Sequence, residues 1–156
     1  CLSLITRQQP IAGDLRMISA ALKVVTDIER IGDQTADIAE LMLRLRDCDL
    51  DAYSRHITGM LQVAKEIVHD AVRAFVNRDS RAADEVIRHD DVVDELFAKV
   101  KDDLVHMLQE GVDNIDACVD VLMIAKYLER IGDHAVNIAE WEIFQESGAI
   151  QHIRLM

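Results

Sequence analysis

Apolar residues recur at spacings of three and four along four long stretches of the chain, which is the period of an amphipathic α-helix. The first stretch shows this spacing in Leu15, Ile18, Leu22 and Val25. The pattern predicts no strands, and it predicts helices over residues of about 14–46, 52–77, 80–109 and 114–146. Because the polar links between them are short, we expect an all-α fold, an antiparallel helical bundle.

The breaks between these stretches contain residues that end or cap helices. Pro10 ends any helix that arrives from upstream, and Asp14 is a candidate N-cap for the first predicted helix. Gly111 closes the third helix, and Asp113 or Asn114 can cap the fourth. Local signals therefore agree with the ends that the apolar pattern predicts.

The chain also contains an internal repeat. Residues 22–40 align with residues 122–140 without a gap, and Glu-Arg-Ile-Gly-Asp occurs in both, at 29–33 and at 129–133. Two unrelated amphipathic helices would rarely share five consecutive residues that include a glycine, which is unfavourable inside a helix. We therefore interpret the two segments as products of a duplication.

The two copies differ in what precedes them. Two complete predicted helices precede the second copy, whereas only thirteen residues precede the helix of the first. We expect residues 52–146 to form a complete three-helix repeat. Residues 1–48 would then be the remnant of a preceding repeat that lacks two helices.

Acidic residues interrupt the apolar stripes of three predicted helices. The first stripe continues past Val25 to Glu29, the equivalent residue of the fourth helix is Glu129, and Asp90 stands among the apolar residues of the third. Residues four apart share a helix face. The candidate metal ligands on these faces are Glu29, Asp33 and Asp37 on the first helix, Asp90 and Asp94 on the third, and Glu129 and Asp133 on the fourth, with Glu40, Asn137 and Glu140 further along.

Carboxylates on a core-facing stripe repel one another and lose hydration, and a multivalent cation relieves both costs. Oxygen ligands suit hard cations such as Mg²⁺, Mn²⁺, Ca²⁺ or Fe³⁺. The alternative is a solvated acidic face, with Arg30 and Arg130 pairing locally. The occurrence of the pattern on three helices favours a metal site. Gly32 and Gly132 fit this interpretation, because a missing side chain lets another helix or a ligand approach closely.

Three histidines, His69, His89 and His134, lie near these carboxylates in the sequence. Adjacent residues on a helix point about 100° apart. We therefore interpret the three histidines as surface or boundary residues rather than as ligands.

Composition limits the function classes. The formal net charge of −12, without a cluster of Lys and Arg, argues against nucleic-acid binding and leaves cations and basic protein surfaces as partners. Three cysteines without a Cys-x-x-Cys pair indicate a reducing compartment rather than a disulfide framework. No apolar run is long enough to span a bilayer, and no signal peptide is visible.

The motifs resemble those of the PhoU family. That family has acidic Glu/Asp-x-x-x-Asp motifs like those above, and an Arg-Gln-Pro segment followed by Asp-Leu-Arg. This sequence has the similar Arg-Gln-Gln-Pro at residues 7–10 and Asp-Leu-Arg at residues 14–16. The resemblance implies repeated three-helix bundles and a metal ion on the acidic motifs, with iron, zinc, manganese or magnesium as the choices. Asn137 replaces an acidic residue of the family pattern. The site on the first helix would be incomplete, or completed by another chain.

The resemblance also implies a function. PhoU proteins are non-catalytic cytoplasmic adaptors between a phosphate ABC transporter and a sensor histidine kinase, and they repress the phosphate-starvation response. We therefore expect a metal-binding regulator of phosphate uptake that forms a homodimer. One alternative is the PhoU-like cytosolic domain of a sodium-phosphate symporter. A ferritin-like di-metal enzyme ranks last, because such bundles carry Glu-x-x-His on two helices, and this chain has that spacing once, at Glu66 and His69.

Overall fold

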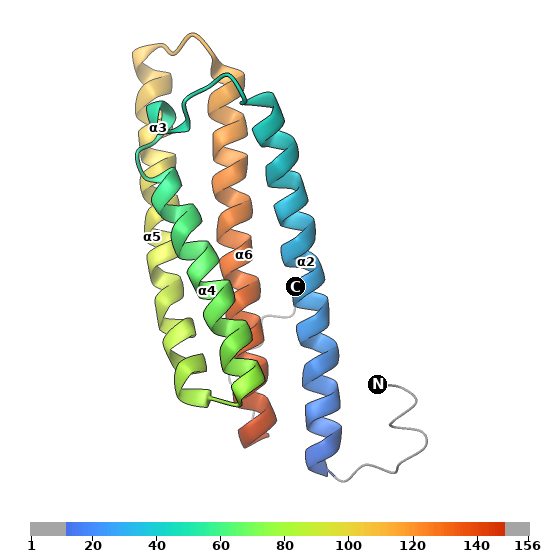
Figure 1. The fold of residues 1–156 in the computed structure, drawn as a ribbon. Coiled ribbons are helices and arrows are strands. Elements are labelled where there is room, and N and C mark those ends of the chain that lie inside the picture. Colours follow the sequence, from blue (N-terminus) through green and yellow to red (C-terminus); the bar gives the residue numbers. More distant parts are fainter. Residues whose placement is uncertain (1–11, 149–156) are drawn as a thin grey trace.

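Four long helices form an antiparallel bundle in the computed structural model, which describes residues 12–148 (Figure 1). In chain order the helices are α2 (Ala12–Arg44), the single turn α3 (Leu50–Tyr53), α4 (Ile57–Asn77), α5 (Ser80–Glu110) and α6 (Ile115–Ser147). The described residues contain no strand, so the predicted all-α bundle is confirmed. Within residues 12–148, no helix combines the length and the apolar character needed to cross a membrane.

Side chains and glycines end the helices as the sequence predicts. Asn114 is the N-cap of α6, where its side-chain oxygen accepts a hydrogen bond from the backbone N–H of Ala117 at 3.1 Å. Gly111 ends α5 in the left-handed region, with φ 87°, which a residue without a Cβ atom adopts at little cost. These two signals separate α5 from α6 and let the two helices pack antiparallel.

Two predicted boundaries were wrong. Asp14 lies in the first turn of α2 and is not its N-cap, because the helix already includes Ala12. The next long helix begins at Ile57 rather than near residue 52, because Ser54 has an extended backbone that ends the turn α3. The predicted break at Pro10 lies outside the described residues.

α6 is the central helix of the bundle. It packs against α2, α4 and α5, whereas α2 packs chiefly against α6. Figure 1 shows α2 on one flank of α6 and the α4–α5 hairpin on the other. Buried residues consequently occur around the circumference of α6, among them Val121, Leu128, Ile131 and Ile138. This position encloses the second copy of the repeat much more than the first.

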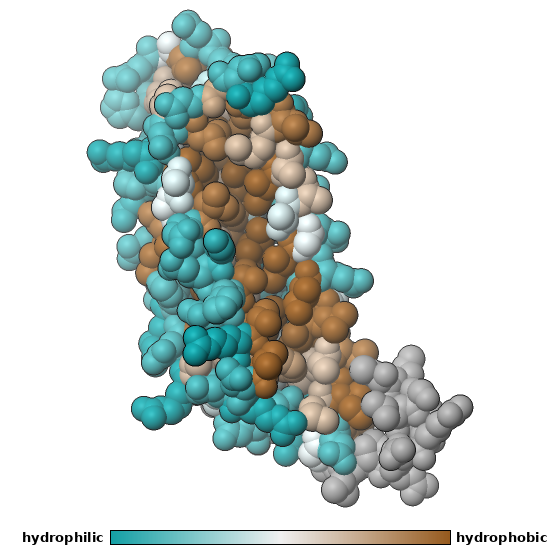
Figure 2. All heavy atoms as spheres, in the orientation of Figure 1, coloured by the Kyte–Doolittle hydropathy of each residue, from teal (hydrophilic) through white to brown (hydrophobic). Residues whose placement is uncertain are grey.

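α2 packs on α6 through a different face from the one that the sequence predicts. Ala20 and Val24 are buried, as is Ile18 of the predicted stripe, whereas Leu22 and Val25 of that stripe are 42% and 57% exposed. Figure 2 shows apolar side chains gathered on the face where α4, α6 and α2 lie side by side. The expected packing of this helix on the bundle is confirmed. The face is wrong, because α2 has two apolar faces and local spacing does not rank them.

Candidate functional site

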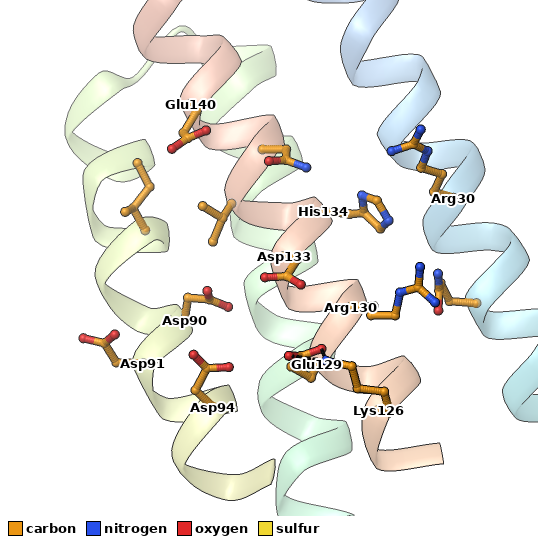
Figure 3. A pocket seen from close by; sticks show the side chains of 14 residues that line it. Arg30, Asp90, Asp91, Asp94, Lys126, Glu129, Arg130, Asp133, His134 and Glu140 are labelled. Carbon is orange, nitrogen blue, oxygen red and sulfur yellow. Dashed lines mark hydrogen bonds and ion pairs between the residues drawn. The ribbon is translucent and has the colours of Figure 1, made fainter. Parts of the chain in front are cut away.

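The predicted carboxylates of the second repeat line one pocket. It lies along α6 and has a volume of about 910 Å³. Its acidic lining comprises Asp90, Asp91 and Asp94 from α5, and Glu129, Asp133 and Glu140 from α6. Figure 3 shows that the predicted ligands of these two helices point into the space between α5 and α6. The two helices are neighbours, so the sequence interpretation of their facing carboxylates is confirmed at the level of placement.

Gly132 lets α5 approach the acidic face of α6. A Cβ atom at this position would lie 2.9 Å from Oδ1 of Asp90 and 3.4 Å from Cγ1 of Val93. Val93 is fully buried, so α5 cannot move away without losing core packing. The predicted role of this glycine, a close approach beside the carboxylates, is confirmed for the second repeat.

Asp90 is a carboxyl group of the pocket whose acidity is strongly altered. Burial raises the pKa of Asp90 from 3.8 to about 7, and the carboxylates of Asp94, Asp133, Glu129 and Asp91 act in the same direction. Near neutral pH this carboxyl group is therefore divided between its protonated and charged forms. A cation bound beside it would favour the charged form and displace the proton.

One cation already neutralises part of the pocket. Nζ of Lys126 donates to both carboxylate oxygens of Glu129 at 2.6 Å and lies 5.4 Å from the centroid of the Phe97 ring. Lys126 therefore competes with a metal ion for the Glu129 carboxylate. Within residues 12–148, no three side chains of His, Cys, Asp or Glu are already arranged around one ion position. The oxygen-only donor set fits a hard cation, and side-chain rotation would have to bring the carboxylates onto it.

The predicted carboxylates of the first repeat do not reach this pocket. Glu29, Asp33 and Asp37 are exposed on α2. A Cβ atom at Gly32 would meet no atom within 4 Å. Asp37 lines a separate pocket of about 210 Å³. The described residues therefore place no helix against the acidic face of this copy of the motif, and the close approach predicted at Gly32 is absent from them.

A buried polar cluster between α2 and α6 was missed by the sequence analysis. Oδ1 of Asp27 accepts hydrogen bonds from Nδ1 of His134 at 2.9 Å and from Nδ2 of Asn137 at 3.2 Å. The side chains of Asp27 and His134 are only 9% and 10% exposed. Gln34 is buried too, and the described residues offer no hydrogen-bond donor to its side-chain carbonyl oxygen. The cluster joins the helices that carry the two copies of the motif.

The interpretation of His134 as a surface or boundary residue is therefore wrong, because α6 is enclosed on its α2 side as well as on its α5 side. His69 and His89 are exposed, as predicted. A sequence signal for the cluster did exist. Asp27 and Gln34 lie seven residues apart and share one face of α2 with Ala20, since a seven-residue spacing nearly restores the same direction on a helix.

α6 contains a further buried carboxyl group outside the pocket. Glu142 is fully buried, and its Oε1 has no hydrogen-bond partner among the described residues. Burial raises the pKa of Glu142 from 4.5 to about 7, Glu146 adds to this rise, and Arg78 opposes it. The aligned residue of the first repeat is Met42, which is 39% exposed. At this pair of aligned positions, a carboxyl group is therefore buried on the central helix α6, and the equivalent side chain on α2 is exposed.

Comparison with known proteins identifies relatives over nearly the whole chain. A family model described as the PhoU domain matches residues 1–42 and 57–141. The phosphate-specific transport system accessory protein PhoU homolog of Burkholderia sp is 34% identical over 98% of this chain and 67% of its own length. The homolog of Aquifex aeolicus is 39% identical over 99% of this chain and 71% of its own length. The chain spans about two thirds of the length of these curated relatives.

Solved structures share the fold. The crystal structure of PhoU from Pseudomonas aeruginosa matches with a TM-score of 0.86 at 33% identity, over 96% of this chain and 72% of that one. The phosphate transport system regulatory protein PhoU from Streptococcus pneumoniae matches with a TM-score of 0.85 at 24% identity, over 97% of this chain and 70% of that one. The expected PhoU-like helical bundle is therefore confirmed.

Proposed function

The chain belongs to the PhoU family, and from this premise we propose that it regulates phosphate uptake with the help of a bound metal ion. Its family is one of accessory and regulatory proteins of phosphate transport and not of enzymes, which agrees with the sequence analysis. The names of the relatives refer to the phosphate-specific transport system. The transporter, the kinase and the metal belong to the proposal.

In this proposal the protein is a cytoplasmic adaptor between a phosphate ABC transporter and a sensor histidine kinase, and it represses the phosphate-starvation response. The names of the relatives support the link to the transporter. The kinase and the cytoplasmic location rest on the family resemblance. We further propose a homodimer, supported by exposed apolar residues on α2 such as Leu22 and Val25. Sedimentation velocity tests the dimer, and a monomer at micromolar concentration would contradict it.

The proposed metal ligands are Asp90 and Asp94 of α5 and Glu129 and Asp133 of α6. One observation carries this assignment: the contact of α5 at Gly132 holds a partly desolvated carboxylate against the acidic face of α6. Such a concentration of negative charge is stabilised by a multivalent cation, with iron, zinc, manganese or magnesium as the candidates. The bound ion would supply positive charge that holds α5 and α6 together. Glu29, Asp33 and Asp37 would bind metal only with ligands from elsewhere.

Elemental analysis of protein purified without chelator tests the metal site. Asp90→Ala combined with Asp133→Ala should abolish bound metal, because it removes one ligand from each helix. Asp84→Ala combined with Asp102→Ala is the matched control, since it removes two exposed carboxylates of α5 that do not line the pocket. Equal metal content in the two double variants, with unchanged helical circular dichroism, would exclude the assignment.

A further inference from the structure

The pocket along α6 has a second side, which the proposed metal ligands do not use. Arg30 from α2 and Arg130 from α6 line this side, together with Gln34, His134 and Asn137. In Figure 3 both arginine side chains extend into the space between α2 and α6, near His134. The pocket thus has carboxylates on its α5 side and guanidinium groups on its α2 side.

The two arginines are equivalent residues of the repeat, since each is the second residue of Glu-Arg-Ile-Gly-Asp. α2 lies antiparallel beside α6 (Figure 1). Both arginines line one pocket there. Within the described part of the chain, neither guanidinium group forms an ion pair or a hydrogen bond. Lys126, by contrast, is bound to Glu129. Two like charges that line one pocket from opposite helices favour an anion between them.

The charge balance makes such an anion depend on a cation. Among the described residues, six carboxyl groups and three cationic side chains line the pocket, so acidic groups outnumber basic groups. Without a cation, this excess repels a dianion. A multivalent cation on the α5 side reduces the excess and leaves the guanidinium groups as the dominant charges on the α2 side.

We propose that Arg30 and Arg130 bind a dianionic tetrahedral oxyanion, either inorganic phosphate or the phosphoryl group of a monoester, when the pocket holds its metal ion. This inference rests on the metal site proposed above and names a ligand for it. A guanidinium group presents N–H donors in a planar fork that matches two oxygens of a phosphoryl group. Two forks from opposite helices therefore hold the tetrahedron from two sides.

Gln34 would let the site discriminate between phosphate and sulfate. Its side-chain carbonyl oxygen is buried without a donor, and Gln34 lines the arginine side of the pocket. Hydrogenphosphate carries an O–H group that can donate to such an acceptor, whereas sulfate has none at neutral pH. The bonds that Asp27 makes to His134 and Asn137 hold the neighbouring wall in place. We therefore expect phosphate to bind more tightly than sulfate.

Equilibrium dialysis of the full chain with Mn²⁺ and radiolabelled inorganic phosphate tests the proposal, with metal content measured on the same samples. We expect saturable phosphate binding to the Mn²⁺-loaded protein and its loss in EDTA. Unlabelled sulfate should compete about tenfold less well than unlabelled phosphate, which corresponds to the loss of one hydrogen bond. Mn²⁺-loaded protein that binds no phosphate, or phosphate binding that persists in EDTA, overturns the inference.

Phenyl phosphate, added as a competitor, distinguishes the two sources of the phosphoryl group. Competition shows that the site accepts a monoester, and its absence, with phosphate bound, restricts the ligand to the free anion. If neither compound binds while the metal is present, the oxyanion site is refuted and the metal site stands. If no metal binds, the proposed function fails first, and the inference fails with it.

Arg30→Gln and Arg130→Gln each remove one fork and keep a long polar side chain. Each should weaken phosphate binding about tenfold or more, because a charged hydrogen-bonding group is lost, and each should leave the metal content unchanged. Arg88→Gln is the matched control, an exposed arginine of α5 outside the pocket lining. Phosphate affinity that is the same in Arg130→Gln as in Arg88→Gln would overturn the assignment.

Discussion

The two copies of Glu-Arg-Ile-Gly-Asp have the same residues and different surroundings. The Glu129 side chain is 16% exposed and paired with Lys126, and Gly132 lies against α5, whereas Glu29 is exposed and the space around Gly32 is open. The difference arises because α6 packs against three long helices and α2 chiefly against one. A repeated motif supplies candidate ligands twice. A partner carboxylate and desolvation come only where another helix lies against it.

The residue that follows Glu-Arg-Ile-Gly-Asp is His134 in the second copy and Gln34 in the first. Substitution by alanine at these two positions should give the largest difference in stability between the copies. His134→Ala leaves Asn137 as the remaining donor to the buried carboxylate of Asp27, and we expect the free energy of unfolding to fall by about 3 kcal/mol. The aligned change Gln34→Ala should cost about 1 kcal/mol, because the Gln34 carbonyl has no hydrogen bond to lose. Urea denaturation measures both values. Equal losses would contradict the importance of the Asp27–His134 pair.

Glu142 and the aligned Met42 should differ in their effect on pH dependence. The unfolded chain releases the Glu142 proton near its ordinary pKa of 4.5, whereas the folded protein holds it to about 7. Stability is therefore lost as the pH rises between these values, by about 3 kcal/mol for a shift of this size. Glu142→Met should remove this loss and stabilise the protein at pH 8 more than at pH 5.

Met42→Glu is the matched control for this test, because it adds a carboxylate at an exposed position and should change stability by less than about 0.5 kcal/mol. Urea midpoints at the two pH values measure the effect. A difference between wild type and Glu142→Met that is the same at both pH values would show that Glu142 is not held in its protonated form.

Substitution of the two motif glycines by alanine should give the smallest changes in stability, and the two changes should have opposite signs. Gly132→Ala forces the Asp90 carboxylate away from its present position, and we expect a loss of about 1–2 kcal/mol in stability together with weaker metal binding. Gly32→Ala has room for its Cβ atom and should gain up to about 1 kcal/mol from helix propensity. Chemical denaturation of both variants provides the test. A stabilising Gly132→Ala would mean that α5 does not pack against this glycine.

Much of the fold could be predicted from local sequence signals. The helices follow from apolar spacing, and their ends follow from residues such as Asn114 and Gly111. The proximity of Asp90 to Asp133 could also be predicted, because Asp90 and Glu129 interrupt apolar stripes on helices that a short link makes neighbours, and Asp133 lies one turn from Glu129. Metal binding by these residues stays a prediction. The division into a remnant at 1–48 and a complete repeat at 52–146 stays one as well.

Other features could not be predicted, because they depend on how many helices surround a residue. Leu22 and Val24 are both apolar, and only the docking of α2 on α6 shows that Val24 is the buried one. Asp27 and His134 are far apart in the sequence, and each is a polar residue of a type that is usually found at the surface. Glutamate is likewise usually exposed, and only the packing of other helices around α6 shows that Glu142 is buried.

By itself, the sequence determined the helices, the ends marked by Gly111 and Asn114, the two copies of the motif and the carboxylates that can meet between α5 and α6. These depend on backbone hydrogen bonding, capping and spacing within one helix, which act over a few residues. Only the tertiary structure decided that the second copy is enclosed and the first is open, and that Arg30 and Arg130 line one pocket. The physical reason is that burial and electrostatic coupling are set by neighbours in space: among the described residues, α6 packs against three long helices and α2 chiefly against one.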